Sequence, residues 1–525
     1  MKIQEEKMRE EEPKIKLKEL SMLRNISIML TQERDFDKLF GHILDAAIEY
    51  TNAEGATIYM VDEENKQLRF IKVFNSMMNI SLNADEIKWP PIQLFSAENE
   101  QNLTNLATLC YHHKCSFNIP DVYEQTVFDN SGTLQYDKMN NYRTKSIVAI
   151  PMMDHKNRII GVIQLVNALD HTGEKIAFAD DEIGNLEVLA SFSAILMNNQ
   201  MLVKDIQTSF HQFISSIAWA IDIKSKHFSG HIARVSQLVG MFADEINNCC
   251  EGKSKFVGIQ FNPDELEEIN IAGLMHDLGK IITPMHILDK SAKLQKITDR
   301  IELVKERIDH IRSLIDNELE HCSEERRKEL LKILLNITRY EPFLIETNPG
   351  RGFLKNEDLD LLEEIYNFRY IYRDQERKII NEDEYKNLCI RTGTLNQEDL
   401  KIIREHVSVT GKMLSQIKFP SYLSNAPLYA ESHHEKLNGT GYPKGLKGDK
   451  IPLQSRIIAL SDVFEALTAT RPYKKPKKLS ETMNILQKMV DNNEIDADLF
   501  EFALERGIFK NYAEIHLKKE LIDIV

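Results

Sequence analysis

Apolar positions follow two different rhythms along the first part of the chain. Residues 21–51 repeat apolar side chains at three- and four-residue steps, which predicts a helix, and this spacing returns over 182–199. Four segments between them alternate or run apolar in the manner of β-strands: 56–61, 68–73, 145–151 and 158–167. A turn is expected at 154–157. The order predicts an antiparallel sheet flanked by helices, in a domain that covers residues 20–199.

A long stretch with helical spacing leads out of this domain. Residues 182–222 contain one glycine, Gly184, and no proline. Large apolar residues recur there at three- and four-residue steps: Leu186, Leu189, Leu196, Leu202, Ile206, Phe210, Phe213, Ile214 and Ile217. One interpretation is a parallel coiled coil between two copies of the chain, and the other is a helix packed within one subunit. We favour the coiled coil, and hence a homodimer, because the stripe crosses the domain boundary.

The remaining chain, residues 222–525, is rich in helical patterns. Its segment 295–395 is highly charged, and within it 301–315 and 324–335 have clear amphipathic spacing. We expect this segment to form an all-α hairpin. Residues 1–19 are a dense mixture of Lys, Arg and Glu, which indicates a solvated helix or tail.

Composition narrows the class of protein. With 525 residues, 42% hydrophobic and 28% charged, the chain reads as a multidomain globular protein. A net charge of −15 argues against nucleic-acid or anionic-membrane binding through bulk electrostatics. We find no apolar run of membrane-spanning length and no signal peptide, and the six cysteines show no paired framework. We therefore expect a cytoplasmic protein with no nucleic-acid and no membrane partner.

Two motifs carry the candidate chemistry. The adjacent pair His433-His434 is followed by the glycine-rich run Asn438-Gly439-Thr440-Gly441-Tyr442-Pro443. The cluster His276-Asp277-Leu278-Gly279-Lys280 lies far upstream. Two neighbouring imidazoles beside a glycine-rich loop are unfavourable to bury unless a metal ion binds them.

With His231, His406 and 457–474, these motifs resemble, in their order along the chain, the HD-GYP family of metal-dependent phosphodiesterases that open cyclic di-GMP. The resemblance implies an all-α catalytic domain over 222–525, in which 295–395 is an insertion. Seven residues stand at the family's ligand positions: His231, His276, Asp277, His406, His433, His434 and Asp462. This set of nitrogen and oxygen ligands suits iron or manganese better than calcium or magnesium.

The number of ligands bears on the mechanism. Seven are too many for one ordinary site and suit two metals, which the resemblance implies are bridged by Asp277. Two neighbouring metals can activate water near neutral pH and clamp both ends of an in-line displacement at phosphorus. The resemblance assigns Lys280 to stabilising the transition-state charge or protonating the leaving 3′-oxygen.

The same resemblance assigns substrate contacts and shows departures. Gly441 and Tyr442 belong to a loop that approaches the ligand closely, and Arg471 and Lys474 would hold the substrate phosphates. Three positions depart from the family pattern: Asn438 replaces the commoner Asp, Ser225 replaces an Asp at the site's mouth, and His227 replaces a Glu that holds a third metal in some members. The expected number of ions is thus two, with a third left open.

The first domain has a resemblance of its own. Residues 118–123, 141–147 and 161–167 are similar to a GAF domain, and most like those of cyclic-nucleotide phosphodiesterases. Cyclic-nucleotide-binding members carry Asn-Lys, then Phe, three residues and Asp-Glu. Here Asn167-Ala168 lacks the Lys, and 178–182 is one residue short. We therefore expect a sensor fold with an unidentified small-molecule ligand.

These resemblances imply an enzyme that hydrolyses cyclic di-GMP to pGpG, and further to GMP, under the control of the GAF domain. One alternative is another 3′,3′-cyclic dinucleotide, such as cyclic GMP-AMP, as the substrate. The other belongs to a different class: a catalytically silent adaptor that binds the dinucleotide or a diguanylate cyclase partner.

Overall fold

The computed structural model describes residues 36–224, 230–251, 254–373, 375–469 and 476–524. The chain divides into two compact units, Met1–Ser209 and Phe210–Val525. Several predictions lie outside the described residues: the tail 1–19, the first part of the helix 21–51, and the side chains of Ser225, His227, Arg471 and Lys474.

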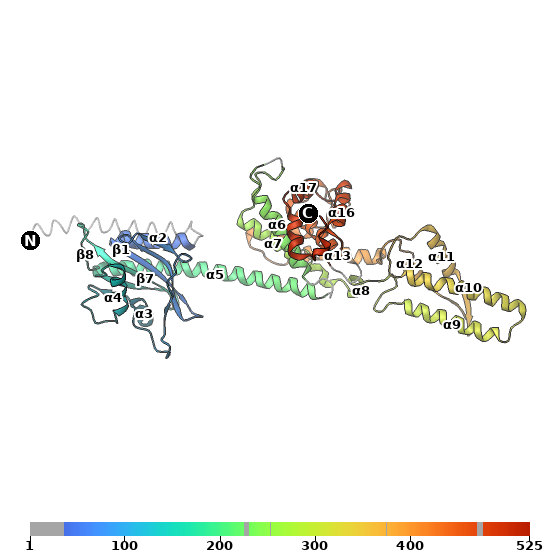
Figure 1. Ribbon diagram of the computed structural model, residues 1–525, viewed down its shortest axis with the longest axis horizontal. Coiled ribbons are helices and arrows are strands. Elements are labelled where there is room, and N and C mark those ends of the chain that lie inside the picture. The colour runs from blue at the N-terminus through green and yellow to red at the C-terminus, as the bar shows by residue number, and fades with distance from the viewer. Residues whose placement is uncertain (1–35, 225–229, 252–253, 374, 470–475, 525) are drawn as a thin grey trace, which may run out of the picture. The chain divides into compact units, whose positions relative to one another are not determined.

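The first unit is built on an antiparallel sheet with the order β3-β2-β1-β7-β6-β5, to which β4 adds beside β2 and β8 beside β7 (Figure 1). The strands are β1 Ala53–Asp62, β2 Gln67–Asn75, β3 Ile80–Asn83, β4 Ile92–Gln93, β5 Phe117–Ile119, β6 Ile147–Met153, β7 Ile159–Leu169 and β8 Lys175–Ile176. The four strands predicted from alternation are confirmed as β1, β2, β6 and β7. The others have two to four residues, which is too few for alternation to show.

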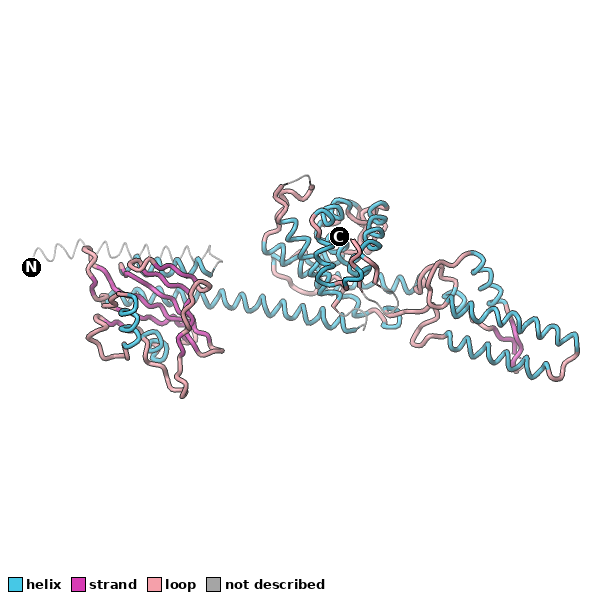
Figure 2. Tube along the Cα trace, viewed as in Figure 1, coloured by secondary structure: helices cyan, strands magenta, loops and turns pink. Residues whose placement is uncertain are grey.

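Helices cover both faces of this sheet (Figure 2). The helices are α2 Phe36–Thr51, α3 Leu106–His113, α4 Ser131–Asn140 and α5 Asp180–Lys224. Alternation along β1 separates two cores: Ile58 packs with α2 and the first part of α5, whereas Tyr59 packs with α3 on the opposite face. The predicted fold, an antiparallel sheet flanked by helices, is confirmed.

Helix α5 has 45 residues and contributes to both units. Leu186, Leu189 and Leu196 are buried in the core of the first unit, and Ile214 is buried in that of the second. Leu202, Ile206 and Phe213 are exposed. The predicted single apolar stripe is therefore divided between two cores, with exposed residues between them.

Within the described residues, α5 is long and apolar enough to cross a membrane by length and composition. We expected no apolar stretch of membrane-spanning length, so this property of α5 was not anticipated. The finding is weak evidence, because a buried helix of a protein core passes the same test. Only part of the apolar window is buried, including Ala190, Ala194 and Met197 in the first unit's core.

The second unit is helical around one large core, as expected. Its helices outside the insertion are α6 His231–Asn247, α7 Pro263–Met275, α8 Met285–Leu288, α13 Gln397–Leu414, α14 Ala426–Glu431, α15 Leu453–Thr468, α16 Leu479–Asp491, α17 Ala497–Glu505 and α18 Ile508–His516. Four short 3₁₀ turns accompany them: η1 Leu278–Ile282, η2 Ser421–Leu423, η3 Gly448–Lys450 and η4 Lys519–Leu521. Helices α6 and α7 pack together, and α13 packs against η1, which brings the chemical motifs into one region.

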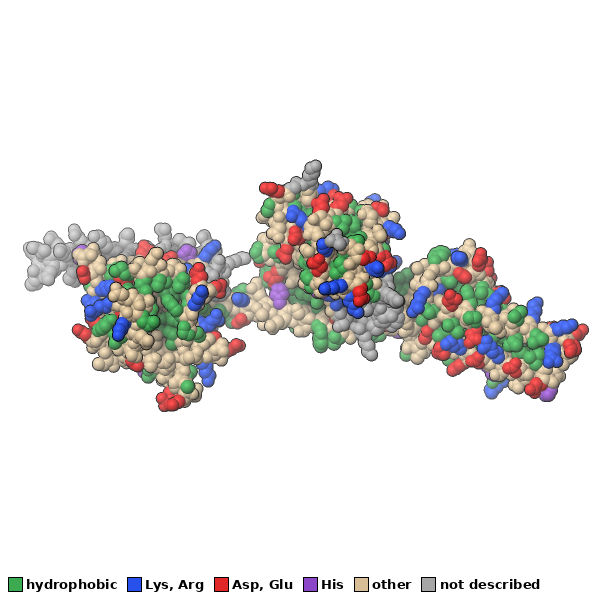
Figure 3. Space-filling model, in the orientation of Figure 1, with side chains coloured by type: hydrophobic (Ala, Val, Ile, Leu, Met, Phe, Trp, Pro, Cys, Tyr) green, Lys and Arg blue, Asp and Glu red, His purple; other side chains and the backbone are tan. Residues whose placement is uncertain are grey.

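The segment 295–395 folds around a core of its own. Its elements are α9 Ile301–Leu319, α10 Glu324–Thr347, α11 Asn356–Asn367, β9 Arg369–Tyr372, β10 Gln375–Lys378 and α12 Glu382–Leu388. The helical pair α9–α10 is confirmed, but the expectation of an all-α hairpin is wrong, because β9 and β10 form a two-stranded sheet. Those strands have four residues each and leave no readable period. Acidic and basic side chains are interspersed over the insertion in Figure 3.

Candidate metal centre

The seven predicted ligands come from separate segments of the second unit. His231 begins α6, His276 and Asp277 follow α7, and His406 lies within α13. His433 and His434 follow α14, and Asp462 lies within α15. The structure brings these side chains together in three groups whose ligand atoms lie within 4.8 Å of one another: His231, His276 and Asp462; His276, Asp277 and His433; and His406, His433 and His434.

Asp277 stands between the two outer groups. Its Oδ2 lies 3.5 Å from Nε2 of His231 and 3.2 Å from Nε2 of His276. Its other oxygen, Oδ1, lies 3.3 Å from Nε2 of His406. One carboxylate therefore faces imidazoles on both sides.

The histidines are oriented in the way that metal binding requires. The Nδ1 atoms of His276 and His433 donate to the carbonyl oxygens of Gly273 and Ala430, at 2.7 and 2.6 Å, and Nδ1 of His406 does the same to Ile403. Since Nδ1 carries the proton, Nε2 keeps a lone pair directed into the cluster. These three Nε2 atoms are buried and make no hydrogen bond within the described chain. The donor set thus fits divalent metal ions.

His231 is held by a carboxylate that sequence reasoning missed. Its Nδ1 donates to Oε2 of Glu465, and Arg234 closes the other side with an ion pair of 2.6 Å to Oε1. Burial opposes protonation of His231, but the hydrogen bonds that its ring donates to the carboxylates of Asp277, Asp462 and Glu465 raise its pKa well above the usual value. The available signal was spacing, because Glu465 lies three residues after Asp462 on α15 and shares its face.

The two sides of the centre differ in charge. Burial and neighbouring imidazoles hold the pKa of His433 well below its usual range, and burial lowers that of His434 to about 4. On the acidic side, burial opposes ionisation of Asp277, yet Lys280 and His276 hold its pKa well below the usual value. The arrangement therefore presents neutral imidazoles on one side and carboxylates on the other.

Two glycines of the motifs permit this packing. A side chain on Gly279 would approach the carbonyl oxygen of His406 to 1.9 Å, so α13 reaches the motif only where that residue is glycine. A side chain on Gly441 would meet the backbone nitrogen of Lys436 at 2.3 Å. The close approach at Gly441 is therefore to its own chain, and the prediction that it contacts substrate stays a prediction.

The predicted loop residue Tyr442 lies beside the cluster. Its ring stacks on His434 with centroids 4.9 Å apart, and the guanidinium of Arg404 lies 5.5 Å from the centre of the same ring. Lys280 donates to Oδ2 of Asp277. Sequence reasoning missed Arg404, although it precedes His406 by two residues and is a cation in a helix that carries a ligand.

The end of α5 reaches the same region of the second unit. Nζ of Lys224 donates to the carbonyl oxygens of Lys280 and Thr283 at 2.9 and 2.8 Å, and also bonds that of Ile281. Lys224 and Asp222 line a small pocket together with His231, Asp277 and Lys280. Nothing in the local sequence pattern marks Lys224, because its partners are backbone atoms 56 to 59 residues away.

Comparison with known proteins places both domains. A GAF domain model matches residues 35–197, and HD domain models match 228–367 and 383–499. Three relatives illustrate the range. The 3′3′-cGAMP-specific phosphodiesterase 1 of Vibrio cholerae is 39% identical over 117 residues, which are 22% of this chain and 26% of the relative. The cyclic di-GMP phosphodiesterase response regulator RpfG of Xanthomonas campestris is 29% identical over 212 residues, 39% of this chain and 54% of the relative.

The cyclic di-GMP phosphodiesterase of Thermotoga maritima is 34% identical over 102 residues, 19% of this chain and 27% of the relative. The matches span between about a quarter and about half of the length of these relatives. Along the chain, a match to the GAF domain is therefore followed by two matches to HD domain models.

Proposed function

We propose that the protein is a metal-dependent phosphodiesterase that hydrolyses cyclic di-GMP to pGpG and further to GMP. The observation that carries this proposal is the carboxylate of Asp277, with one oxygen toward His231 and His276 and the other toward His406. An adaptor that only binds a ligand has no need for such an arrangement. The names of the relatives, which act on cyclic di-GMP or 3′3′-cGAMP, support the substrate class.

The seven residues would hold two divalent ions, iron or manganese. Ions at such a centre supply Lewis acidity toward the phosphoryl oxygens and lower the pKa of water. His276, His406 and His433 present nitrogen donors that are held in place by their Nδ1–H bonds, and Glu465 fixes His231. Metal analysis decides whether a third ion binds at His227.

Cations around the centre would hold the substrate. Lys280 lies beside Asp277, where its ammonium can stabilise charge on the phosphoryl group or protonate the departing 3′-oxygen. Arg404, placed over Tyr442, offers a planar fork for a phosphodiester. We further assign the phosphate contacts of Arg471 and Lys474 and the loop contact of Gly441 on the resemblance alone.

A second candidate substrate has support of its own. One relative named as specific for 3′3′-cGAMP is 39% identical over the segment it shares with this chain. Both dinucleotides have the same ring of two phosphodiesters and differ in one base. The metal centre acts on the feature that they share, so the two must be compared directly.

Regulation by the GAF domain is part of the proposal. Helix α5 is continuous from the core of the first unit to the carbonyl oxygens that Lys224 binds beside Lys280. Val188, Ile195 and Leu202 are exposed at seven-residue intervals on the same helix, which is the spacing of a coiled-coil seam. We therefore propose a homodimer through α5, and a cytoplasmic setting that the six free cysteines support.

The test uses full-length protein purified without oxygen and loaded with iron or manganese. Hydrolysis of cyclic di-GMP and of 3′3′-cGAMP is followed with metal content measured on the same samples. Asp277→Ala is the inactive variant, and Asp85→Ala, an exposed carboxylate of the first unit, is its control. Hydrolysis of cyclic di-GMP that depends on Asp277 supports the proposal. Dinucleotide binding without metal and without hydrolysis would replace it with the adaptor.

A further inference from the structure

The first unit contains a cavity of about 410 Å³ beside its sheet, within the size range of small-molecule sites. Residues from β1, β2 and β7 line one side, and the first turn of α4 lines another. Thr57 and Gln164, which are register partners on β1 and β7, both face it. The cavity lies within the first unit and is separate from the metal centre.

Aromatic rings form one wall of the cavity. The rings of Tyr59 and Phe70 lie 4.9 Å apart, and Phe70 meets Trp89 edge-on at 5.5 Å. Trp89 is 39% exposed, whereas Tyr59 is buried, so the series runs from the surface inward. Rings in this arrangement offer faces and edges to a flat ligand.

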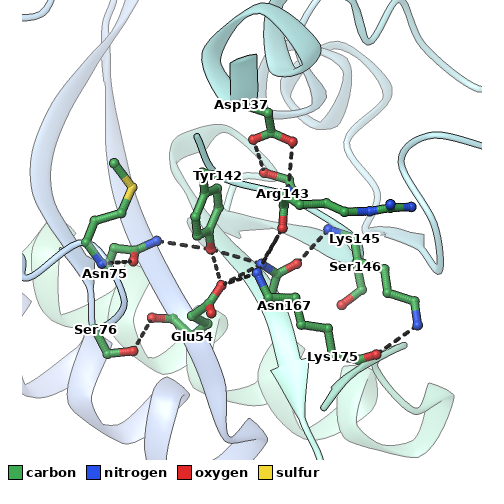
Figure 4. Close-up of polar contacts among 12 residues, drawn as sticks. Glu54, Asn75, Ser76, Asp137, Tyr142, Arg143, Lys145, Ser146, Asn167 and Lys175 are labelled. Carbon is green, nitrogen blue, oxygen red and sulfur yellow. Dashed lines mark hydrogen bonds and ion pairs between the residues drawn. The ribbon is translucent and has the colours of Figure 1, made fainter. Parts of the chain in front are cut away.

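The lining of the cavity is uncharged. Among the described residues that line it, none is charged. Tyr142, a lining residue, donates to Glu54 and accepts from Asn167 at 2.9 Å, and Lys175 pairs with Glu54 at 3.0 Å (Figure 4). Burial and the bond to Glu54 raise the pKa of Tyr142, so its phenol is neutral. The lining residue that contacts this ion pair is thus itself uncharged.

The first turn of α4 does not compensate for the missing cations. Gly132 and Thr133 line the cavity there, and free backbone N–H groups at a helix start usually attract anions. Here, however, the carboxylate of Asp129 accepts the backbone N–H of Ser131 at 3.0 Å, which lowers its pKa. An anion thus already accepts one N–H of this helix start, and a phosphate group in the cavity would meet no cation among the described lining residues.

One lining residue, Gln164, has a buried acceptor without a hydrogen bond. Its Oε1 accepts no hydrogen bond from the described residues. A carboxamide presents an acceptor and a donor side by side, and the complementary edge is that of adenine, with an amino group beside a ring nitrogen. A ligand with an N–H group at this place would satisfy the oxygen that the fold leaves unmet.

From these features we propose that the cavity binds an uncharged purine, as base or nucleoside, with its ring against the aromatic wall and its polar edge on Gln164. The chemistry excludes the corresponding phosphates, including cyclic monophosphates.

Equilibrium dialysis of the full-length protein tests the proposal with four probes: adenosine, guanosine and the 3′,5′-cyclic monophosphate of each. We expect a nucleoside to bind at least about tenfold more tightly than its cyclic monophosphate, because the phosphate would lose water without gaining a cation. Gln164→Leu should weaken nucleoside binding by about tenfold or more. Gln101→Leu, at an exposed position outside the cavity, is the control and should leave binding unchanged.

Trp89→Ala provides a second, surface-accessible variant, and it should weaken binding even if Gln164→Leu does not fold. The proposal is overturned if neither nucleoside binds, if a cyclic monophosphate binds as tightly as its nucleoside, or if neither variant changes binding. Dialysis involves no turnover, so a negative result here leaves the proposed hydrolysis of cyclic di-GMP to be judged on its own assay.

Discussion

The metal centre and the cavity of the GAF domain differ in the polar groups that each contains. The centre gathers five histidines and two aspartates from separate helices and turns. The cavity has no charged residue among the described ones that line it, and the ion pair of Glu54 and Lys175 contacts the lining through Tyr142. The first is suited to ions and phosphates, and the second to a neutral ring.

The difference also shows what stabilises each region. Buried charges are tolerated where they are paired and hydrogen-bonded, and at the centre Asp277 faces three imidazoles and an ammonium. In the cavity the unmet group is a single neutral oxygen, on Gln164. A bound small molecule can therefore leave the cavity at little cost in free energy. Replacement of a metal-binding residue, by contrast, leaves the centre with uncompensated charge.

The largest effect is expected from removing the shared carboxylate. Asp277→Ala should reduce hydrolysis of cyclic di-GMP by at least ~10³-fold, because both sides of the centre lose a common partner. Metal content should fall with it. Metal analysis together with single-turnover kinetics checks this, and a variant that keeps two ions and most of its rate would refute the assignment of Asp277 as shared ligand.

A smaller loss is expected from Glu465→Gln. The amide keeps the size of the side chain but no longer offers a carboxylate to Nδ1–H of His231, so metal affinity should fall by roughly 10–100-fold. Titration with a competing chelator measures it. Excess metal should restore much of the rate, which a general loss of folding would not allow. Glu405→Gln, an exposed residue of α13, should match the wild type.

The pattern of this centre shows which parts of a site can be read from a sequence. The adjacent pair His433-His434 and the cluster from His276 to Lys280 were visible because ligands with neighbouring positions leave a compact motif. Glu465 and Arg404 were missed because what marks them is a contact with a residue distant in the sequence, His231 for Glu465 and Tyr442 for Arg404, and no motif records such contacts.

The fold was predictable to a similar degree. Strands of seven to eleven residues carry an apolar or alternating run long enough to be recognised, as β6 and β7 do. The short strands β9 and β10 are set by pairing with each other, which no local pattern shows. The stripe on α5 was seen, but its division between two cores depends on tertiary packing.

The link between α5 and the centre can be weakened without touching a ligand. Lys224→Gln cannot bind three carbonyl oxygens at once, so the backbone that carries Lys280 should be held less firmly. We expect kcat to fall by a few-fold to about tenfold, with metal content and KM nearly unchanged. Lys204→Gln, exposed on the same helix, is the control. An equal fall in both variants would mean that the helix surface, and not the contact, matters.

The smallest effect concerns a buried cation outside both regions. Lys293 is 2% exposed and donates to the carbonyl oxygen of Leu388 at 2.9 Å, and burial lowers its pKa to about 8. The unfolded chain has the ordinary value of 10.5, so between these values it binds more protons than the folded chain. The free energy of unfolding should therefore rise with pH across this window, by at most ~1.4 kcal/mol per unit.

Lys293→Met removes the titrating group, so the difference in melting temperature between wild type and variant isolates its contribution. We expect the wild type to gain on the variant by a few degrees between pH 8 and 10, while Lys328→Met, exposed on α10, shows no such trend. A constant difference across this range would mean that Lys293 keeps its charge on folding. Burial in this protein would then shift the pKa of a group only where, as at the metal centre, other charged groups lie beside that group.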